Sequence, residues 1–287
     1  MRESETSLSK SELNYIKSRL KSRNPVIQFD LLKMYFGKPY EIDLEGVDGS
    51  ITIYPPTIGD VVDYGEKEWY ANLSPLISNT TTYRYPLSLQ GIDWTQLSDF
   101  ELFCSCLYNQ PEPEFNQILF HQDLSEFSLH YREIEGEEGE IKHIPVLYNE
   151  ETETEINEQV YFHISQYLRK CFHNEPKEQM TTQEALKKVW LRKDATDIHN
   201  AKWREKNGLN EENVLMNLIS SCINHPGFSY KINELSELPM FAFMDSVARL
   251  QLYESTIALL HGSYSGMCDM SKIDKENFNF MREIKFE

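Results

Sequence analysis

The sequence predicts an α+β protein that is mainly α-helical, with β-hairpins in the amino-terminal half and helices filling the carboxy-terminal half. Two stretches before residue 150 alternate apolar and polar residues, which is the period of a half-buried strand. Beyond that point apolar residues recur at helical spacing, and 40% hydrophobic residues in a chain of 287 are enough to bury a core. We therefore expect a hairpin-plus-helix domain at 1–150 and a helical domain at 151–287.

The first predicted element is a helix over Leu8–Arg23. Ser9 and Glu12 have capping-box spacing, and the apolar residues Leu13, Ile16 and Leu20 follow on one face. Residues 1–23 carry six Lys and Arg against three Glu. A narrow apolar stripe on so short a helix fits packing on its own domain or docking on another surface.

A β-hairpin is predicted over 39–54, with a turn at Asp48-Gly49. A helix over 57–76 should follow, opened by a capping box of Thr57 and Asp60 and kinked at Gly65. Its expected buried face consists of Ile58, Val61, Val62, Trp69, Leu73 and Leu76.

After a polar loop at Ser78–Tyr83, a second helical unit should begin near Gly91. Ser98 and Glu101 have capping-box spacing there, and Pro111 and Pro113 should end the helix.

A second hairpin is predicted over Phe127–Tyr148. Ten glutamates and one lysine, Lys142, lie between Glu133 and Glu158. This run indicates a solvated hairpin tip and linker, or a docking patch for a basic partner.

The remaining chain reads as helices. The periodic stretches are residues 156–171, a helix opened by Thr181 with Glu184 that continues to 206, a helix capped by Asn210 that stops at His225-Pro226-Gly227, and a long apolar helix over Met240–Leu260. Pro239 suits the first position of that last helix, and Gly262 suits its carboxy-terminal cap. An amphipathic segment, Ile273–Ile284, is expected to close the chain.

Composition excludes several classes of protein. A net charge of −18 opposes non-specific attraction to nucleic acid and anionic lipid. No run approaches the 18 apolar residues of a membrane span, and no apolar core follows the charged amino terminus, so we expect a cytosolic protein with no membrane partner. The five cysteines have no zinc-site spacing and are expected to be reduced and buried.

Known catalytic motifs are missing, and the eight histidines are scattered. HGSYSG (261–266) resembles a nucleophile elbow but places Tyr264 at the central position after a predicted helix, so it fits a turn better. We therefore expect no catalytic residue, no cofactor and no metal, and a protein that is not an enzyme. An enzyme with a site assembled from dispersed residues remains an open alternative.

The basic helix 187–206, with Trp190 and Trp203, is the best nucleic-acid candidate in the sequence. Asp194, Asp197 and Glu205 interrupt its charge, which favours a solvated helix face with both tryptophans buried.

Four stretches carry a family resemblance: TIGDVVDYGEKEWYANLSPL (57–76), LSDFELF (97–103), LPMFAFMDSVARLQ (238–251) and SGMCDMSKIDKENFNFMRE (265–283). Together they resemble assembly or structural proteins encoded in the tail gene clusters of phages and prophages of low-GC bacteria. Small acidic non-enzymes in such clusters look most like tail-assembly chaperones, which sheathe the tape-measure protein.

The resemblance implies a non-catalytic tail assembly or structural protein that binds other tail components, in the host cytoplasm or the virion. The alternative is a nucleic-acid-associated or regulatory binding protein, and self-association into a homo-oligomer is left open.

Overall fold

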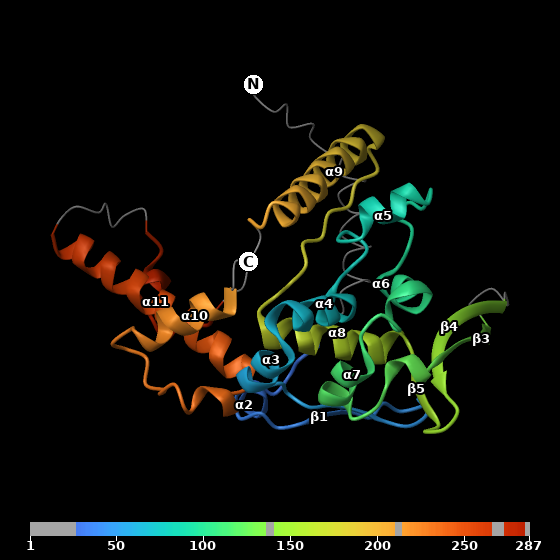
Figure 1. Cartoon of the computed structure of the whole chain (residues 1–287), viewed down its shortest axis with the longest axis horizontal. Coiled ribbons are helices and arrows are strands. Elements are labelled where there is room, and N and C mark those ends of the chain that lie inside the picture. The colour runs from blue at the N-terminus through green and yellow to red at the C-terminus, as the bar shows by residue number, and fades with distance from the viewer. Residues whose placement is uncertain (1–26, 136–140, 210–213, 266–272, 285–287) are drawn as a thin grey trace.

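The computed structural model describes residues 27–135, 141–209, 214–265 and 273–284. Helices dominate it, and the strands form two small sheets in the amino-terminal half, so the predicted α+β, mainly α-helical class is confirmed (Figure 1). The predicted helix at Leu8–Arg23, the tip of the second hairpin, the Asn210 cap and Cys268 lie outside the described residues.

The α-helices are α2 (Leu31–Tyr35), α3 (Ile58–Tyr64), α4 (Glu66–Ile77), α5 (Arg84–Leu89), α6 (Asp99–Leu102), α7 (Pro113–Phe120), α8 (Glu158–Phe172), α9 (Glu184–Lys206), α10 (Val214–Ile223) and α11 (Met240–Tyr264). The strands are β1 (Tyr40–Ile42), β2 (Ile51–Ile53), β3 (Ser128–Glu135), β4 (Ile141–Asn149) and β5 (Thr154–Ile156). The single turns are a π-helical turn η1 (Phe103–Leu107) and 3₁₀ turns η2 (Leu124–Glu126), η3 (Leu235–Glu237) and η5 (Lys275–Phe278).

The first predicted hairpin is confirmed as β1 paired with β2, with Tyr40 opposite Ile53. Its predicted turn is wrong, because residues 43–50 separate the strands and Asp48-Gly49 serves a long-range contact instead. The Asp48 carbonyl accepts the Glu155 amide of β5 at 2.8 Å. Gly49, with φ of +69°, lets this backbone approach Thr154.

Two helices occupy the stretch predicted as one kinked helix. Thr57 and Asp60 form the expected capping box at the start of α3, and Gly65, with φ of +101°, separates α3 from α4. The expected burial of Val62 is wrong: its side chain is 57% exposed, whereas Ile58 and Val61 of the same helix are buried.

The predicted polar loop after α4 is mostly buried. Asn79 and Thr80 are fully buried, and the Asp99 carboxylate accepts the Thr80 amide at 2.8 Å. The helix α5 follows directly, earlier than the predicted start near Gly91. Ser98 and Glu101 form the predicted capping box of α6, whereas Pro113 begins α7 instead of ending a helix.

The second predicted hairpin is confirmed as β3 paired with β4, with Ser128 opposite Tyr148. The sequence did not indicate β5, which adds a third strand beside β4. The Glu155 side chain on β5 is buried and binds the guanidinium of Arg132 on β3. Arg132, which directly precedes the acidic run, therefore neutralises one of its glutamates.

The centre of the core is α8, which packs on both α4 and α11. Its buried residues include Tyr161, Ile164 and Tyr167, which join Trp69 and Leu73 of α4 in one hydrophobic cluster. The buried Arg169 of α8 donates to the carbonyl of Ile77 at 2.7 Å. These contacts cross residue 150, where the boundary between two subdomains stays a prediction.

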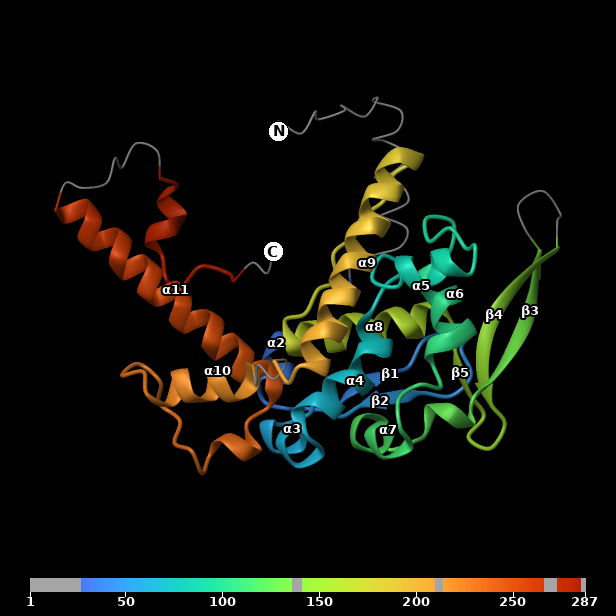
Figure 2. The same ribbon diagram turned by 45° about the horizontal axis from the view of Figure 1, so that its top comes forward.

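The helices α9 and α11 both extend away from the helical body, as Figures 1 and 2 show. Trp203, expected to be buried, is 56% exposed because the end of α9 has little packed against it. Gly262 lies inside α11, which continues to Tyr264, so the predicted cap is wrong by about one turn. Across the described ranges, none of the helices combines the length and apolar character that crossing a bilayer needs.

Candidate functional site

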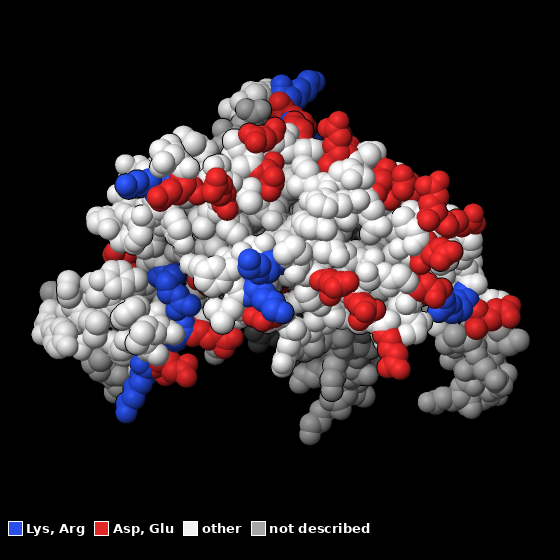
Figure 3. Space-filling view, turned by 90° about the horizontal axis from the view of Figure 1, so that it is seen from below, with Lys and Arg blue, Asp and Glu red and all other residues white. Residues whose placement is uncertain are grey.

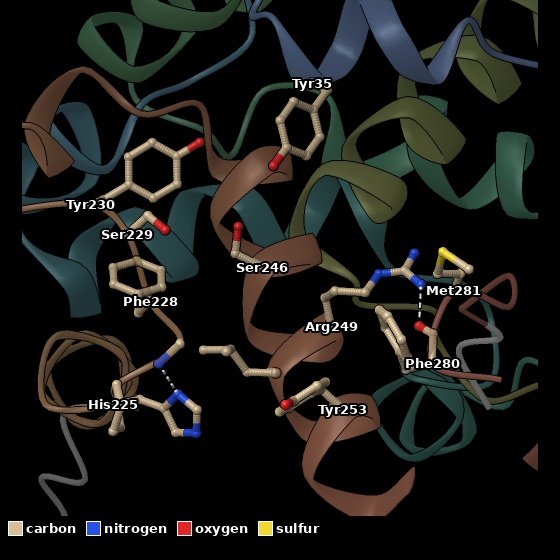
Figure 4. Close-up of a pocket in the computed structure, with 13 residues that line it drawn as sticks. Tyr35, His225, Phe228, Ser229, Tyr230, Ser246, Arg249, Tyr253, Phe280 and Met281 are labelled. Atoms are coloured by element: carbon tan, nitrogen blue, oxygen red, sulfur yellow. Dashed lines mark hydrogen bonds between the residues drawn. The ribbon is translucent and has the colours of Figure 1, made fainter. Parts of the chain in front are cut away.

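A cavity of about 890 Å³ lies where α11 meets the loop that follows α10 (Figure 4). The 225–230 loop forms one wall, the segment around Phe280 forms the opposite wall, and Tyr35 of α2 reaches in from the body. The volume falls in the range of ~300–1,000 Å³ that is common for ligand pockets. We call this cavity the α11 pocket.

Five Phe and Tyr rings contribute to the lining of the α11 pocket. Phe228 and Tyr230 pack on each other with ring centres 5.5 Å apart. On the other side Tyr253 meets Phe280 edge to face, at 5.7 Å and 86°. Leu250 of α11 also belongs to the lining. Aromatic walls of this kind offer large apolar contact area to a ligand or a partner side chain.

Arg249 holds one wall of the pocket in place. Its Nη1 donates to the carbonyls of Phe280, at 3.0 Å, and Arg282, at 2.8 Å. About two turns further along α11, the Thr256 hydroxyl donates to the Asn277 carbonyl at 3.4 Å. The closing segment of the chain is therefore fastened along α11 by polar contacts to its backbone.

His225 is the group in the pocket that most resembles a catalytic base. Its Nδ1 accepts the Gly227 amide at 3.0 Å, and its Nε2 lies 3.1 Å from Glu254 Oε1. Since an amide can only donate, Nδ1 is the acceptor and Nε2 carries the proton given to Glu254. Both ring nitrogens are thus engaged, and neither one is oriented to take a proton from a nucleophile.

The pocket hydroxyls are arranged for hydrogen bonding rather than for attack. The Ser246 hydroxyl donates to the Ala242 carbonyl at 2.7 Å within its own helix. Burial, reinforced by the neighbouring Tyr35 hydroxyl, raises the pKa of Tyr230, so its phenol stays protonated at neutral pH. The α11 pocket therefore presents aromatic surface, hydroxyls and one guanidinium, which suits recognition.

The basic helix identified in the sequence is α9, and ion pairs hold its amino-terminal half against the body. Lys187 Nζ lies 2.5 Å from Asp93 Oδ2 and 3.1 Å from Glu184. Asp194 binds Arg84, whose guanidinium lies 5.4 Å from the centre of the Trp190 ring. Beyond Thr196 the helix is largely exposed, including Trp203.

The other residues considered from the sequence do not converge on a site. Cys104, Cys171 and Cys222 are buried free thiols as predicted, whereas Cys106 is exposed. Within the described ranges, no three His, Cys, Asp or Glu side chains form a group that could hold a metal ion.

Sequence reasoning missed the α11 pocket because its residues come from four separate segments. Two local signals did mark its position. The predicted stop at His225-Pro226-Gly227 belongs to one wall, and the stretch LPMFAFMDSVARLQ (238–251) contributes Ser246, Arg249 and Leu250 to the lining.

Comparison of the chain with protein-family models, curated proteins and solved structures gives no match.

Proposed function

We propose that the chain is a non-catalytic assembly or structural protein of the phage-tail type, which binds another tail component through the α11 pocket. The observation that carries this proposal is the chemistry of the pocket. Its aromatic walls are open to apolar side chains, while its histidine and its α11 serine are already bonded within the protein.

An apolar helix is the partner that fits these walls. Tyr253 is 39% exposed, Phe280 42% and Met281 75%. A partner can therefore contact apolar area at the rim without any unfolding of the protein. Amphipathic helices dock into such grooves through side chains spaced three and four residues apart. A long tape-measure-like helix needs its apolar stripes covered before assembly, because exposed apolar patches promote aggregation.

The gene neighbourhood gives the first test, since a following gene for a very long helical protein is expected. Co-expression of that protein with the chain should keep it in the soluble fraction as a complex. Ser229 lies in an exposed loop of the pocket lining, so the indole of Ser229→Trp should fill the pocket and abolish the complex with the helical protein. Ile232→Ala, an exposed apolar position outside the pocket lining, is the matched control and should bind normally. Equal binding by both variants would refute the assignment.

The alternative, a nucleic-acid-associated protein, is favoured by the exposure of Trp203. This ring lies among Lys202, Arg204 and Lys206 on the open end of α9, where a base could stack on it. The formal charge of −18 opposes this reading. Weak, salt-sensitive binding of single-stranded DNA that Trp203→Ala removes would support the alternative over the proposed function.

A further inference from the structure

A second hollow, of about 610 Å³, lies at the other end of the molecule, between the β3–β4 hairpin and the helices α5 and α6 with the turn η1. Its floor contains Leu102, Cys104 and Leu107, and its outer wall is the hairpin face that carries Leu129, Tyr131 and Pro145. We call it the hairpin groove. It shares no lining residue with the α11 pocket.

The hairpin groove is apolar and open. Side chains alternate along β3, so Leu129 and Tyr131 face the groove while Arg132 turns to the opposite face and binds Glu155. Leu129 is 37% exposed and Tyr131 63%. Large apolar side chains that border a hollow and remain in water are typical of an interaction site.

The floor of the hairpin groove contains an irregular helix. The Tyr108 amide donates to the Phe103 carbonyl, five residues earlier, at 3.0 Å. This turn is therefore a π-helical turn, which contains one residue more than an α-helical turn. Such turns are rare and occur frequently at functional sites. Here the turn places Cys104 in the floor and leaves Cys106 exposed at the rim.

Within the described residues, the carboxylates at the groove have no Lys or Arg beside them in its lining. The lining contains Glu101, and Glu133 stands beside the lining residue His143. Burial raises the pKa of Glu158, and the nearby Glu101 and Asp99 raise it further. Figure 3 shows acidic side chains gathered over the right-hand side of the molecule, where β3, β4 and β5 lie in Figure 1.

The chain itself contains a segment of complementary chemistry. Leu8–Arg23 holds five Lys and Arg against one Glu, in a protein whose overall charge is −18. Its predicted helix presents Leu13, Ile16 and Leu20 on one face. Three apolar side chains over two turns, flanked by cations, match an apolar groove with an acidic rim.

The attachment point of this segment favours binding between two molecules. It joins the body just ahead of α2, which lies on the far side of α8 from the hairpin in both ribbon views (Figures 1 and 2). We propose that the hairpin groove binds the basic amino-terminal segment Leu8–Arg23 of a second copy of this chain. The contact is head to tail, so repeated copies form a ring or a filament.

Sedimentation velocity of the full chain over a range of concentrations tests the proposal. We expect reversible association that weakens as salt rises, since exposed charges are screened. Tyr131→Ser removes an exposed aromatic anchor and should weaken association by roughly tenfold or more. Tyr264→Ser, at a residue that is 85% exposed on α11, is the matched control and should associate like the unmodified protein.

A charge exchange identifies the occupant. Glu133→Lys at the rim and Lys17→Glu in the segment should each weaken association, and the two together should restore it. A monomer at every concentration, or a double variant weaker than both single variants, would overturn the proposal. The proposed function does not enter this test, which needs no other protein and leaves the α11 pocket unchanged.

Discussion

Replacing Arg84 by Met tests whether a buried ion pair fastens α9 to the body. The Arg84 side chain is 8% exposed, and it binds Asp194 through two nitrogens, with Nη2 at 2.6 Å from Oδ1. Its third nitrogen donates to the Gln179 side chain. One residue therefore joins α5, α9 and the segment that precedes α9.

The expected cost follows from what the substitution leaves behind. Removing one partner of a buried ion pair costs about 3–5 kcal/mol, because the other charge stays buried without compensation. The Asp194 side chain is 21% exposed, so water recovers part of its solvation, and a Met stem still packs on Trp190. We expect Arg84→Met to lower the free energy of unfolding by about 3 kcal/mol.

Urea unfolding followed by circular dichroism measures this difference. Arg84→Met combined with Asp194→Leu removes the stranded carboxylate, and this double variant should lose about 1 kcal/mol or less. Arg192→Met, on an exposed part of the same helix, is the control and should change stability by less than about 0.5 kcal/mol. A cost for Arg84→Met below about 1 kcal/mol, or a double variant as unstable as the single one, would refute the reasoning.

Two further predictions concern the backbone and the pH response. Gly49→Ala should destabilise the folded protein far more than Gly46→Ala. Both glycines have positive φ, but only at Gly49 would a Cβ lie 2.8 Å from the Thr154 hydroxyl. Thermal unfolding of the two variants measures the difference. Burial, helped by Lys170, lowers the pKa of His173 from 6.5 to about 4, so the unfolded chain takes up a proton first and stability falls as pH drops from about 6.5 towards 4. In His173→Asn, the asparagine tolerates the local φ of +48°, and the urea midpoint should depend less on pH between about 6.5 and 4 than in the unmodified protein. An unchanged pH dependence would contradict the role given to His173.

Local signals in the sequence predicted local structure well. The capping boxes at Thr57 and Ser98 form as expected, since each needs only residues three positions apart. The strand pairs β1–β2 and β3–β4 follow from alternation over a few residues. The fold class was predictable for the same reason, because it depends on which period dominates in each half of the chain.

The errors arise where a distant segment decides the outcome. Asp48-Gly49 has the composition of a hairpin turn, yet its backbone is held by the Glu155 amide, more than 100 residues away. The acidic residues among the lysines of 187–206 favoured a solvated helix face with Trp203 buried, but burial requires a neighbour that the end of α9 does not have. The α11 pocket is of the same kind, since its four contributing segments come together only through tertiary packing.

The two proposed surfaces lie at opposite ends of one helical body, with α4 and α8 between them (Figure 1). Their chemistries also differ, because Arg249 is a charged group lining the α11 pocket whereas Glu101 is the carboxylate lining the hairpin groove. A basic segment is therefore attracted to the groove and repelled by the guanidinium at the pocket. Sites that are far apart and share no residues contribute independently. Copies joined through their hairpin grooves would keep every α11 pocket open, so self-association would line up repeated binding sites along a partner helix.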